Sequence, residues 1–375
     1  MERGFSAPRL FKSSLNCYPI LTSPGLDTNM KYFWKAAKFA LHCQLPTPPK
    51  VSEQEISVKT DQFEIPAILY TPKGKSCGTI LAVNGLAYMG NKDPRFAAVC
   101  KSAAAVGYTV ISPLLVEVTQ FRIRKETVEK IKDLILHISS NKEYCPDQKL
   151  SYIAPSFSGS MGLIAASDPE VGKKISSILT IGAYCDVQST LDYVMTSDEG
   201  DEYGRMILLY NFVKYALKSD NQELEFALKA CVLDGSFSRE NLELPTVLEN
   251  ISEENKEIFF KLREDKSFRE KIWKEIVANA GSQSSFLQEL QVKDKLHLLD
   301  CHVSIVHGLG DNVVPAKEAL ILKENLPRKK SKLVLTPLIS HGDVGISLGQ
   351  IPAIYDLVQG FAFFFKNAKV KEKAA

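Results

Sequence analysis

The residues best suited to chemistry lie in the segment LSYIAPSFSGSMGLIAA, residues 150–166. An apolar run typical of a strand leads into a cluster of small residues, and a helix-like run follows at once. This order is that of a sharp strand–turn–helix junction, which can expose a serine hydroxyl as a nucleophile. Small neighbours are needed because the backbone of such a turn is strained. Two serines compete for the tip: Ser156, in the register A-P-S-F-S, and Ser158, in the register S-F-S-G-S.

A serine hydroxyl needs a general base, and the base needs a partner that fixes its orientation. The segment SIVHGLGDNVVP, 304–315, combines a strand, a glycine turn and an aspartate, Asp311, just past the strand end. The segment LVLTPLISHGDVG, 333–345, places His341 in a loop after the following strand. The carboxyl edge of a parallel sheet is where functional groups gather. Both side chains are therefore candidates for the same site.

A reacting carbonyl also needs hydrogen-bond donors for the negative charge that develops on its oxygen. The residue after the nucleophile, Phe157 if Ser156 reacts, offers one backbone N–H. The loop in LAVNGLAYMG, 81–90, follows another strand-like run and offers a second, from Leu86. We expect these two N–H groups to form the oxyanion hole.

The elements that must position these residues follow an alternating pattern. Residues 55–60 and 63–72 are expected to form an antiparallel strand pair, and a strand–helix alternation follows, which predicts a mostly parallel sheet flanked by helices. The later strands are expected at 78–85, 108–114, 150–156, 175–184, 301–308 and 331–337, and helices at 94–107, 125–140 and 315–326. The strand runs are almost continuously apolar, as strands covered on both faces should be.

Residues 187–297 break this alternation, because they contain many helical patterns and no strand-like run. We therefore expect three regions. Residues 1–52 form an N-terminal arm and helix, 53–186 and 298–375 form the α/β core, and 187–297 form an inserted helical cap.

The helix expected at 30–43 has two interpretations. Its basic residues Lys31, Lys35 and Lys38 lie beside Trp34 and Phe39, which is a pattern of helices that lie on a membrane surface. The alternative, which we favour, is a helix docked on the main domain.

Composition narrows the function classes. A net charge of +2 gives no electrostatic footprint for nucleic acid. The eight cysteines are scattered singly, without metal-site spacing or a disulfide framework, so reduced thiols and a cytoplasmic location fit best. The N-terminus lacks the apolar core of a signal peptide, and no run of apolar residues is long enough to span a membrane.

From about residue 54 to 368 the chain resembles the α/β-hydrolase superfamily. The resemblance rests on the N-G-L loop at 84–86, the D-P-R-F helix start at 93–96, the A-P-S-F-S-G elbow, the G-x-x-D-x-x-V-P turn and the S-H-G-D loop. It implies a triad in the order Ser156, Asp311, His341. Ser156 is favoured over Ser158 because relatives commonly place the serine six residues after the first apolar strand residue, here Leu150. Asp186, which follows the sixth strand, supplies the acid in a minority of relatives and stays an alternative.

This resemblance implies a serine hydrolase that cleaves a small carboxylic ester or thioester through an acyl-serine intermediate. Neither a metal nor an organic cofactor is expected. The helical cap would cover the site and select part of the substrate. Because neither elbow register has glycine at both flanking positions, a non-catalytic protein that binds a ligand or partner through the same fold is the alternative function.

Overall fold

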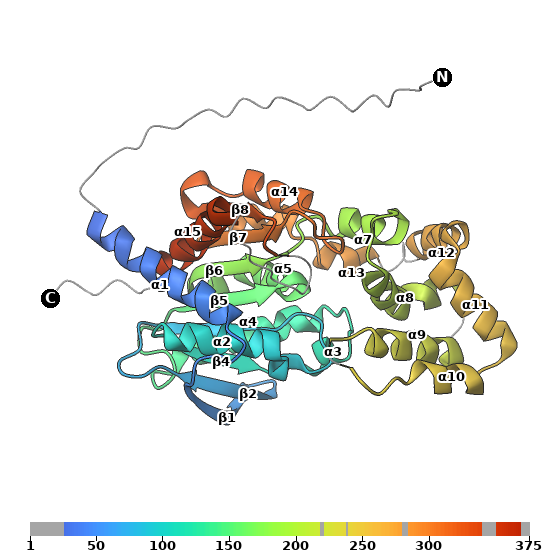
Figure 1. Cartoon of the computed structure of the whole chain (residues 1–375), viewed down its shortest axis with the longest axis horizontal. Coiled ribbons are helices and arrows are strands. Elements are labelled where there is room, and N and C mark those ends of the chain that lie inside the picture. Colours follow the sequence, from blue (N-terminus) through green and yellow to red (C-terminus); the bar gives the residue numbers. More distant parts are fainter. Residues whose placement is uncertain (1–25, 218–220, 238, 280–283, 340–349, 369–375) are drawn as a thin grey trace, which may run out of the picture.

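The computed structural model describes residues 26–217, 221–237, 239–279, 284–339 and 350–368 (Figure 1). Its centre is an eight-stranded sheet in the order β1-β2-β4-β3-β5-β6-β7-β8. The strands are β1 (Ser52–Lys59), β2 (Glu64–Thr71), β3 (Thr79–Ala82), β4 (Thr109–Pro113), β5 (Leu150–Pro155), β6 (Ile175–Ile181), β7 (His302–Gly308) and β8 (Ser331–Thr336).

Strand direction divides the sheet into two parts. β1 and β2 pair antiparallel, and β2 runs antiparallel to β4. From β4 to β8 every neighbouring pair is parallel. The edge strand β1 is exposed along most of its length, whereas β5, in the middle, is buried at five of its six residues. The apolar strand runs of the sequence therefore occupy the interior of the sheet, where helices cover both faces.

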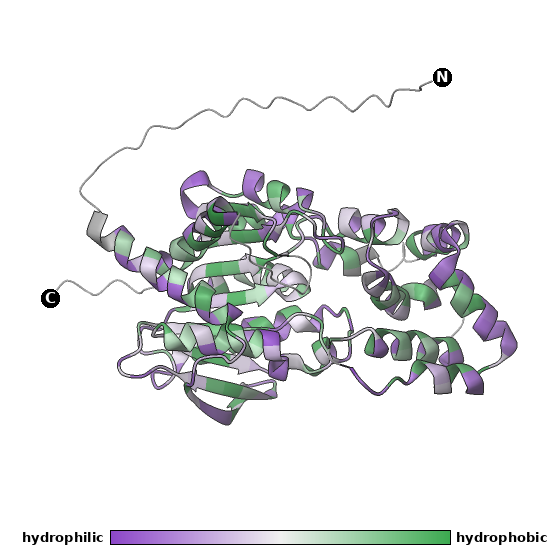
Figure 2. Ribbon diagram, viewed as in Figure 1, coloured by the Kyte–Doolittle hydropathy of each residue, from purple (hydrophilic) through white to green (hydrophobic). Residues whose placement is uncertain are grey.

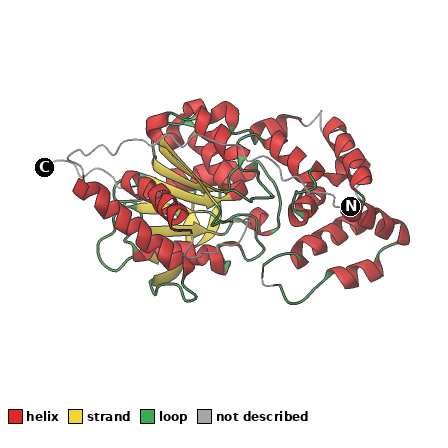
Figure 3. Cartoon of the chain, turned by 45° about the horizontal axis from the view of Figure 1, so that its top comes forward, coloured by secondary structure: helices red, strands yellow, loops and turns green. Residues whose placement is uncertain are grey.

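Helices cover the two faces of the sheet in separate groups (Figure 3). One face carries α1 (Leu26–Gln44), α2 (Pro94–Ala105) and α15 (Ile351–Asn367), and the other carries α4 (Glu126–Ser140), α5 (Ser156–Ala166) and α14 (Lys317–Asn325). Shorter turns are η1 (Gly90–Lys92), α3 (Val116–Thr119), α6 (Pro169–Gly172) and η4 (Arg328–Lys330). The mostly parallel sheet flanked by helices is confirmed, and this strand order is that of the α/β-hydrolase fold.

Between β6 and β7 the described residues form helices without a strand. They are α7 (Val187–Thr196), α8 (Glu202–Leu217), α9 (Gln222–Asp234), α10 (Leu244–Asn250), α11 (Glu253–Glu264), α12 (Lys266–Asn279), α13 (Ser284–Glu289) and η3 (Lys293–Leu298). In Figure 1 most of this helical insertion lies at the right of the sheet, on the side where α5 begins.

One buried amide joins the helical insertion to the core. Asn211 of α8 accepts a hydrogen bond from the N–H of Ile123 at 3.0 Å and donates to the carbonyl of Phe121 at 2.8 Å. The rings of Phe121 and Tyr203 also meet edge to face, with centroids 6.2 Å apart. The insertion is thus held against the loop that follows β4, at the carboxyl edge of the sheet.

Helix α1 is docked on the main domain, as we favoured. Tyr32, Ala36 and Phe39 are buried along one of its faces. The Phe39 ring packs edge to face against Phe361 and Phe365 of α15, with centroid distances of 5.0 and 5.2 Å. Figure 2 shows hydrophobic and hydrophilic residues alternating along this helix. Among the described helices, none is long and apolar enough to cross a membrane.

Several expected strand ends differ from the structure by one to three residues, and two of them have a clear local cause. The strand expected to reach Ser156 stops at Pro155, because Ser156 already begins α5. The strand expected to reach residue 184 stops at Ile181, because Gly182 turns into the left-handed region with φ of +68°. Glycine adopts that conformation at little cost, and it ends the ladder.

Candidate active site

Ser156 occupies a strained position at the junction of β5 and α5. Its φ is +50°, and it is one of three non-glycine residues with positive φ in the described part of the chain. The strand passes into the helix without an intervening loop, so one residue must absorb the whole change of direction. Left-handed backbone at a non-glycine residue costs free energy and is characteristic of functional sites. The side chain is partly exposed.

Ser158, the competing serine, has a different environment. It is fully buried, and its hydroxyl donates a hydrogen bond of 2.5 Å to the carbonyl oxygen of Asn84. A substrate carbonyl could not reach this hydroxyl without displacing the loop after β3. The bond instead fastens the first turn of α5 to that loop.

The loop after β3 lies directly against the Ser156 turn. A Cβ atom built on Gly85 would be 3.5 Å from Cγ of Pro155 and 3.9 Å from Cβ of Ser156. No described residue accepts a hydrogen bond from the backbone N–H of Leu86. The N–H of Phe157 belongs to the first turn of α5, where helix geometry provides no intrahelical acceptor. Both expected oxyanion donors thus come from segments that border Ser156.

The close approach of α5 to the sheet depends on two glycines, Gly159, which the sequence analysis placed in the elbow motif, and Gly162, which it did not mention. A Cβ at Gly159 would lie 2.9 Å from the carbonyl oxygen of Ala154 and 3.2 Å from Cβ of Ala183. At Gly162 it would lie 2.1 Å from the ring of Tyr152. The positions that must be small are therefore three and six residues after Ser156. The G-S-M-G spacing was the signal for them, because glycines one helical turn apart share a helix face.

Asp311 lies in the turn after β7 and is almost completely buried. One carboxylate oxygen accepts hydrogen bonds from the N–H groups of Val313, at 3.0 Å, and Val314, at 2.9 Å. The other oxygen is 3.6 Å from Nε2 of His307 and would be 3.1 Å from a Cβ on Gly182. The carboxylate is therefore oriented by the N–H groups of its own turn, as aspartates in turns commonly are.

His307 is a second histidine near this acid. Its ring is fully buried within β7, and Nε2 lies 2.7 Å from the carbonyl oxygen of Val314. Because a carbonyl only accepts, Nε2 carries a proton and donates it. The His307 ring thus stabilises, from its buried side, the turn that contains Asp311.

The sheet register fixes how far Ser156 lies from the acid turn. Pro155 of β5 is paired with Ile181 of β6, and Ile181 with Val306 of β7. Ser156 and Asp311 thus extend beyond the same edge from strands separated by one strand, which corresponds to about 10 Å between backbones. His341, expected between them, lies outside the described residues.

Asp186, the alternative acid, caps a helix. Its Oδ1 accepts hydrogen bonds from the N–H of Ser189, at 3.2 Å, and from the side-chain amide of Gln291, at 3.3 Å. Its backbone N–H is bound by Glu318, a residue that the sequence analysis did not single out. Oε2 of the fully buried Glu318 accepts from the N–H groups of Cys185, at 3.0 Å, and Asp186, at 2.7 Å. A glutamate inside the pattern PAKEALILKENL resembles a surface residue, so only the tertiary structure discloses its role.

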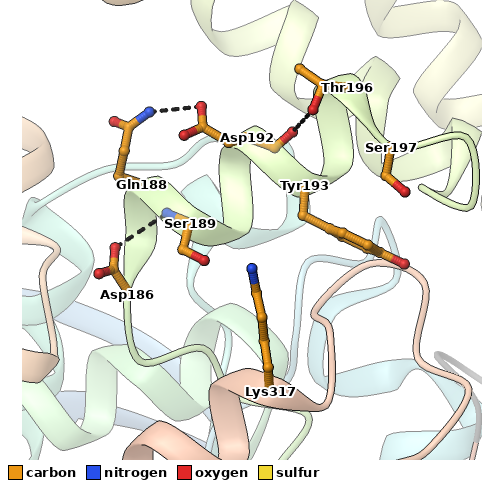
Figure 4. A pocket seen from close by; sticks show the side chains of 8 residues that line it. All are labelled: Asp186, Gln188, Ser189, Asp192, Tyr193, Thr196, Ser197 and Lys317. Carbon is orange, nitrogen blue, oxygen red and sulfur yellow. Dashed lines mark hydrogen bonds between the residues drawn. The ribbon is translucent and has the colours of Figure 1, made fainter.

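A polar cavity opens beside the junction between β6 and α7. Its volume is about 540 Å³, and α7 and the start of α14 provide most of its lining. Figure 4 shows the Lys317 side chain directed toward α7, between Ser189 and Tyr193. The complete lining is Asp186, Gln188, Ser189, Asp192, Tyr193, Thr196, Ser197 and Lys317.

The buried thiols and the possible metal ligands can be described from their surroundings. Burial raises the pKa of Cys100, Cys185 and Cys301 to about 12 each, so these side chains stay protonated thiols near neutral pH. Every described cysteine is free of a disulfide. Within the described ranges no three His, Cys, Asp or Glu residues are grouped to hold a metal ion.

Comparison with known proteins gives likeness of structure only. Models of known protein families and curated protein sequences yield no match. Acylaminoacyl peptidase from Pyrococcus horikoshii is similar over 87% of this chain with 12% identity and a TM-score of 0.47, but the chain spans only 43% of that protein. Dienelactone hydrolase from Anabaena variabilis is similar over 86% of this chain and 100% of its own, with 12% identity and a TM-score of 0.46. An α/β fold family hydrolase from Bacillus anthracis is similar over 82% and 99%, with 14% identity and a TM-score of 0.43.

Proposed function

We propose that this protein of the α/β-hydrolase fold is a serine hydrolase with Ser156 as its nucleophile. The observation that carries the proposal is the left-handed backbone of Ser156 at a strand–helix junction, with a partly exposed side chain. Strain of this kind persists only where the surrounding structure enforces it. The buried Ser158 hydroxyl, bound to the Asn84 carbonyl, supports the same choice.

The first chemical step would form an acyl-serine. Oγ of Ser156 attacks the substrate carbonyl while His341 takes the hydroxyl proton, and the negative charge moves to the carbonyl oxygen. The N–H groups of Leu86 and Phe157 would stabilise that charge. When the tetrahedral intermediate collapses, the bond to the leaving group breaks and His341 returns the proton to it. Water then repeats the sequence on the acyl-serine and releases the acid.

Asp311 would orient His341 and stabilise its protonated form. Two N–H bonds hold one oxygen of Asp311 in place, so the carboxylate cannot rotate freely. Asp186, whose Oδ1 caps α7 and also accepts from the Gln291 amide, stays the alternative acid. The chain order Ser156, Asp311, His341 is the order that this fold uses.

A carboxylic ester or thioester is the substrate class that we propose. Both bonds have a leaving group that needs little assistance beyond one proton from the base. The helical insertion would border the acyl or alcohol side, because its α8 packs on the loop after β4 near the Ser156 edge. Peptide cleavage by the same residues is the competing reaction, and it can be measured beside ester and thioester hydrolysis.

A fluorophosphonate probe tests the nucleophile. We expect the native protein to be labelled and Ser156→Ala to lose at least about 99% of the labelling rate, since the attacking oxygen is removed. Ser160→Ala is the matched control, because Ser160 lies in the same helix turn and its buried hydroxyl binds the Tyr184 carbonyl. Labelling that survives in Ser156→Ala but disappears in Ser158→Ala would assign the reaction to Ser158.

Substrate class is tested with p-nitrophenyl esters of increasing acyl length, acyl-CoA thioesters and aminoacyl p-nitroanilides. Turnover of esters or thioesters that depends on Ser156, with slower anilide cleavage, is the expected result. Preferential anilide cleavage would replace the ester assignment by a peptidase. Native protein that is neither labelled nor active would favour a non-catalytic binding protein.

A further inference from the structure

Helix α1 has an exposed face that its docking does not explain. Among residues 29–44 of this helix, the exposed ones are Asn29, Met30, Lys31, Trp34, Lys38 and Leu41, and we call them the outer face of α1. Trp34 is 63% exposed, Leu41 61% and Met30 50%. A helix that only docks on its domain usually presents polar residues to water. Here three large apolar side chains alternate with two lysines.

The apolar surface continues onto the neighbouring helix α15. The Phe33 ring meets the Trp34 ring at 5.9 Å and the Tyr355 ring at 5.7 Å between centroids. Tyr355 is 53% exposed, and Ile351, one turn earlier on α15, is 66% exposed. The outer face of α1 and the first turns of α15 therefore form one surface that two helices share.

The charges on this surface are mainly positive. Lys31 and Lys38 are exposed and flank Trp34, and residues 29–44 of α1 include no acidic residue. Lys35 belongs to the docked side instead, since its ammonium contacts Sγ of Cys77 at 3.3 Å and lies 4.7 Å from the centre of the Tyr108 ring. Asp356, next to Tyr355, is the acidic residue at the α15 margin.

We infer that this shared surface of α1 and α15 binds the surface of an anionic lipid membrane. Tryptophan, leucine and methionine would enter the boundary between headgroups and acyl chains, and the lysines would reach the lipid phosphates. A protein partner fits less well, because lysine is depleted in the cores of protein interfaces. The inferred attachment is peripheral, because α1 stays docked on the main domain through the buried Tyr32, Ala36 and Phe39.

The position of the surface predicts how the bound protein is oriented. In Figure 1, α1 and α15 lie at the left of the molecule, and the helical insertion lies at the right. Membrane contact through α1 would therefore leave the Ser156 edge of the sheet open to solution. It follows that hydrolysis of a water-soluble ester should not depend on the α1 surface.

Tryptophan fluorescence of the full chain tests the inference directly. The chain has two tryptophans, and Trp273 is only 4% exposed, with its indole N–H bound to Asp192 at 2.7 Å. A change on adding vesicles therefore reports Trp34. We expect a blue shift and co-sedimentation with phosphatidylcholine vesicles that contain phosphatidylserine, and much weaker effects with phosphatidylcholine alone or at high salt.

Two variants and one control separate the contribution of the lysines to vesicle binding from that of the apolar side chains. Lys31→Glu with Lys38→Glu, and Trp34→Ser with Leu41→Ser, should each lower the partition coefficient for anionic vesicles more than about 10-fold. Phe226→Ser is the control, because Phe226 is 58% exposed on α9 of the helical insertion. Probe labelling of Ser156 should remain unchanged in all three, which separates this test from that of the proposed function.

Three results would overturn the inference. The first is native protein that does not sediment with anionic vesicles. The second is binding that the α1 substitutions leave unchanged or that Phe226→Ser reduces equally. The third is a concentration-dependent dimer, seen by light scattering, that the α1 substitutions dissociate, because the occupant of the surface would then be a second copy of the chain.

Discussion

The carboxyl ends of β5 and β6 are neighbours in the sheet, yet the chain leaves them in opposite ways. At β5 the strand becomes a helix within one residue, and the strain falls on Ser156. At β6 the glycine Gly182 takes the left-handed turn, and no residue between it and Asp186 has a positive φ. The Asp186 side chain then caps α7, and the Glu318 carboxylate accepts a hydrogen bond from the backbone N–H of Asp186.

This difference separates the position of the proposed nucleophile from one that has a structural role. At the β6–α7 junction the carboxylates of Asp186 and Glu318 each accept hydrogen bonds from backbone N–H groups. At the β5–α5 junction the hydroxyl of Ser158, two residues away, binds the Asn84 carbonyl and fastens the helix. The Ser156 hydroxyl does not have this structural role.

Exchanging the two aspartates for asparagine tests this division most strongly. Asp311→Asn should lower the rate of ester hydrolysis by on the order of 10³–10⁴-fold, because a neutral amide cannot stabilise a protonated histidine. Asp186→Asn should change the rate less than about 3-fold, since asparagine caps helices as well as aspartate does. Steady-state kinetics would decide, and a larger loss for Asp186→Asn would make Asp186 the acid.

Packing under the β5–α5 junction gives the next largest effect. Gly159→Ala should lower the free energy of unfolding by about 1–3 kcal/mol, because the new methyl group would overlap the Ala154 carbonyl oxygen. Gly310→Ala is a suitable control, since a Cβ there meets no atom within 4 Å. Thermal unfolding followed by circular dichroism measures both. Equal stability of the two variants would mean that α5 can move away from the sheet without cost.

Glu318 provides a comparable test at the β6–α7 junction. Glu318→Ala leaves two buried N–H groups without an acceptor, which should cost about 1–3 kcal/mol of unfolding free energy. Glu318→Gln should restore most of the loss, because its amide oxygen can take the place of Oε2. The other oxygen, Oε1, has no partner among the described residues, so replacing it with an amide nitrogen removes no bond. A glutamine variant as unstable as the alanine variant would contradict this role.

The smallest effect is expected at Cys185. Burial, reinforced by the nearby carboxylates of Glu318 and Asp186, raises the pKa of this thiol to about 12. A raised pKa favours the protonated form, so at pH 8 only about 10⁻⁴ of the side chain is the reactive thiolate. Iodoacetamide at pH 8 should therefore leave Cys185 unmodified, as peptide mass spectrometry can show. Rapid alkylation would reveal that this junction opens to solvent.

The sequence predicts the fold better than it predicts the site. Apolar strand runs and the capping pair Asp93–Pro94 place most elements within a few residues, because periodicity and turn chemistry are local signals. The local pattern predicts the strained turn but not which serine stands at its tip, because the burial of Ser158 arises from packing between α5 and the loop after β3. Glu318 was missed for the same reason, since its partners are more than a hundred residues away in the chain.

The backbone at Ser156 has one further consequence, for evolution and for engineering. A left-handed residue with a side chain stores about 1–3 kcal/mol of strain, and glycine at the same position would relieve most of it. Ser156→Gly should therefore be both inactive and more resistant to heat. Selection for thermal stability alone would favour this inactive variant, so a library screened for stability needs a simultaneous selection for turnover.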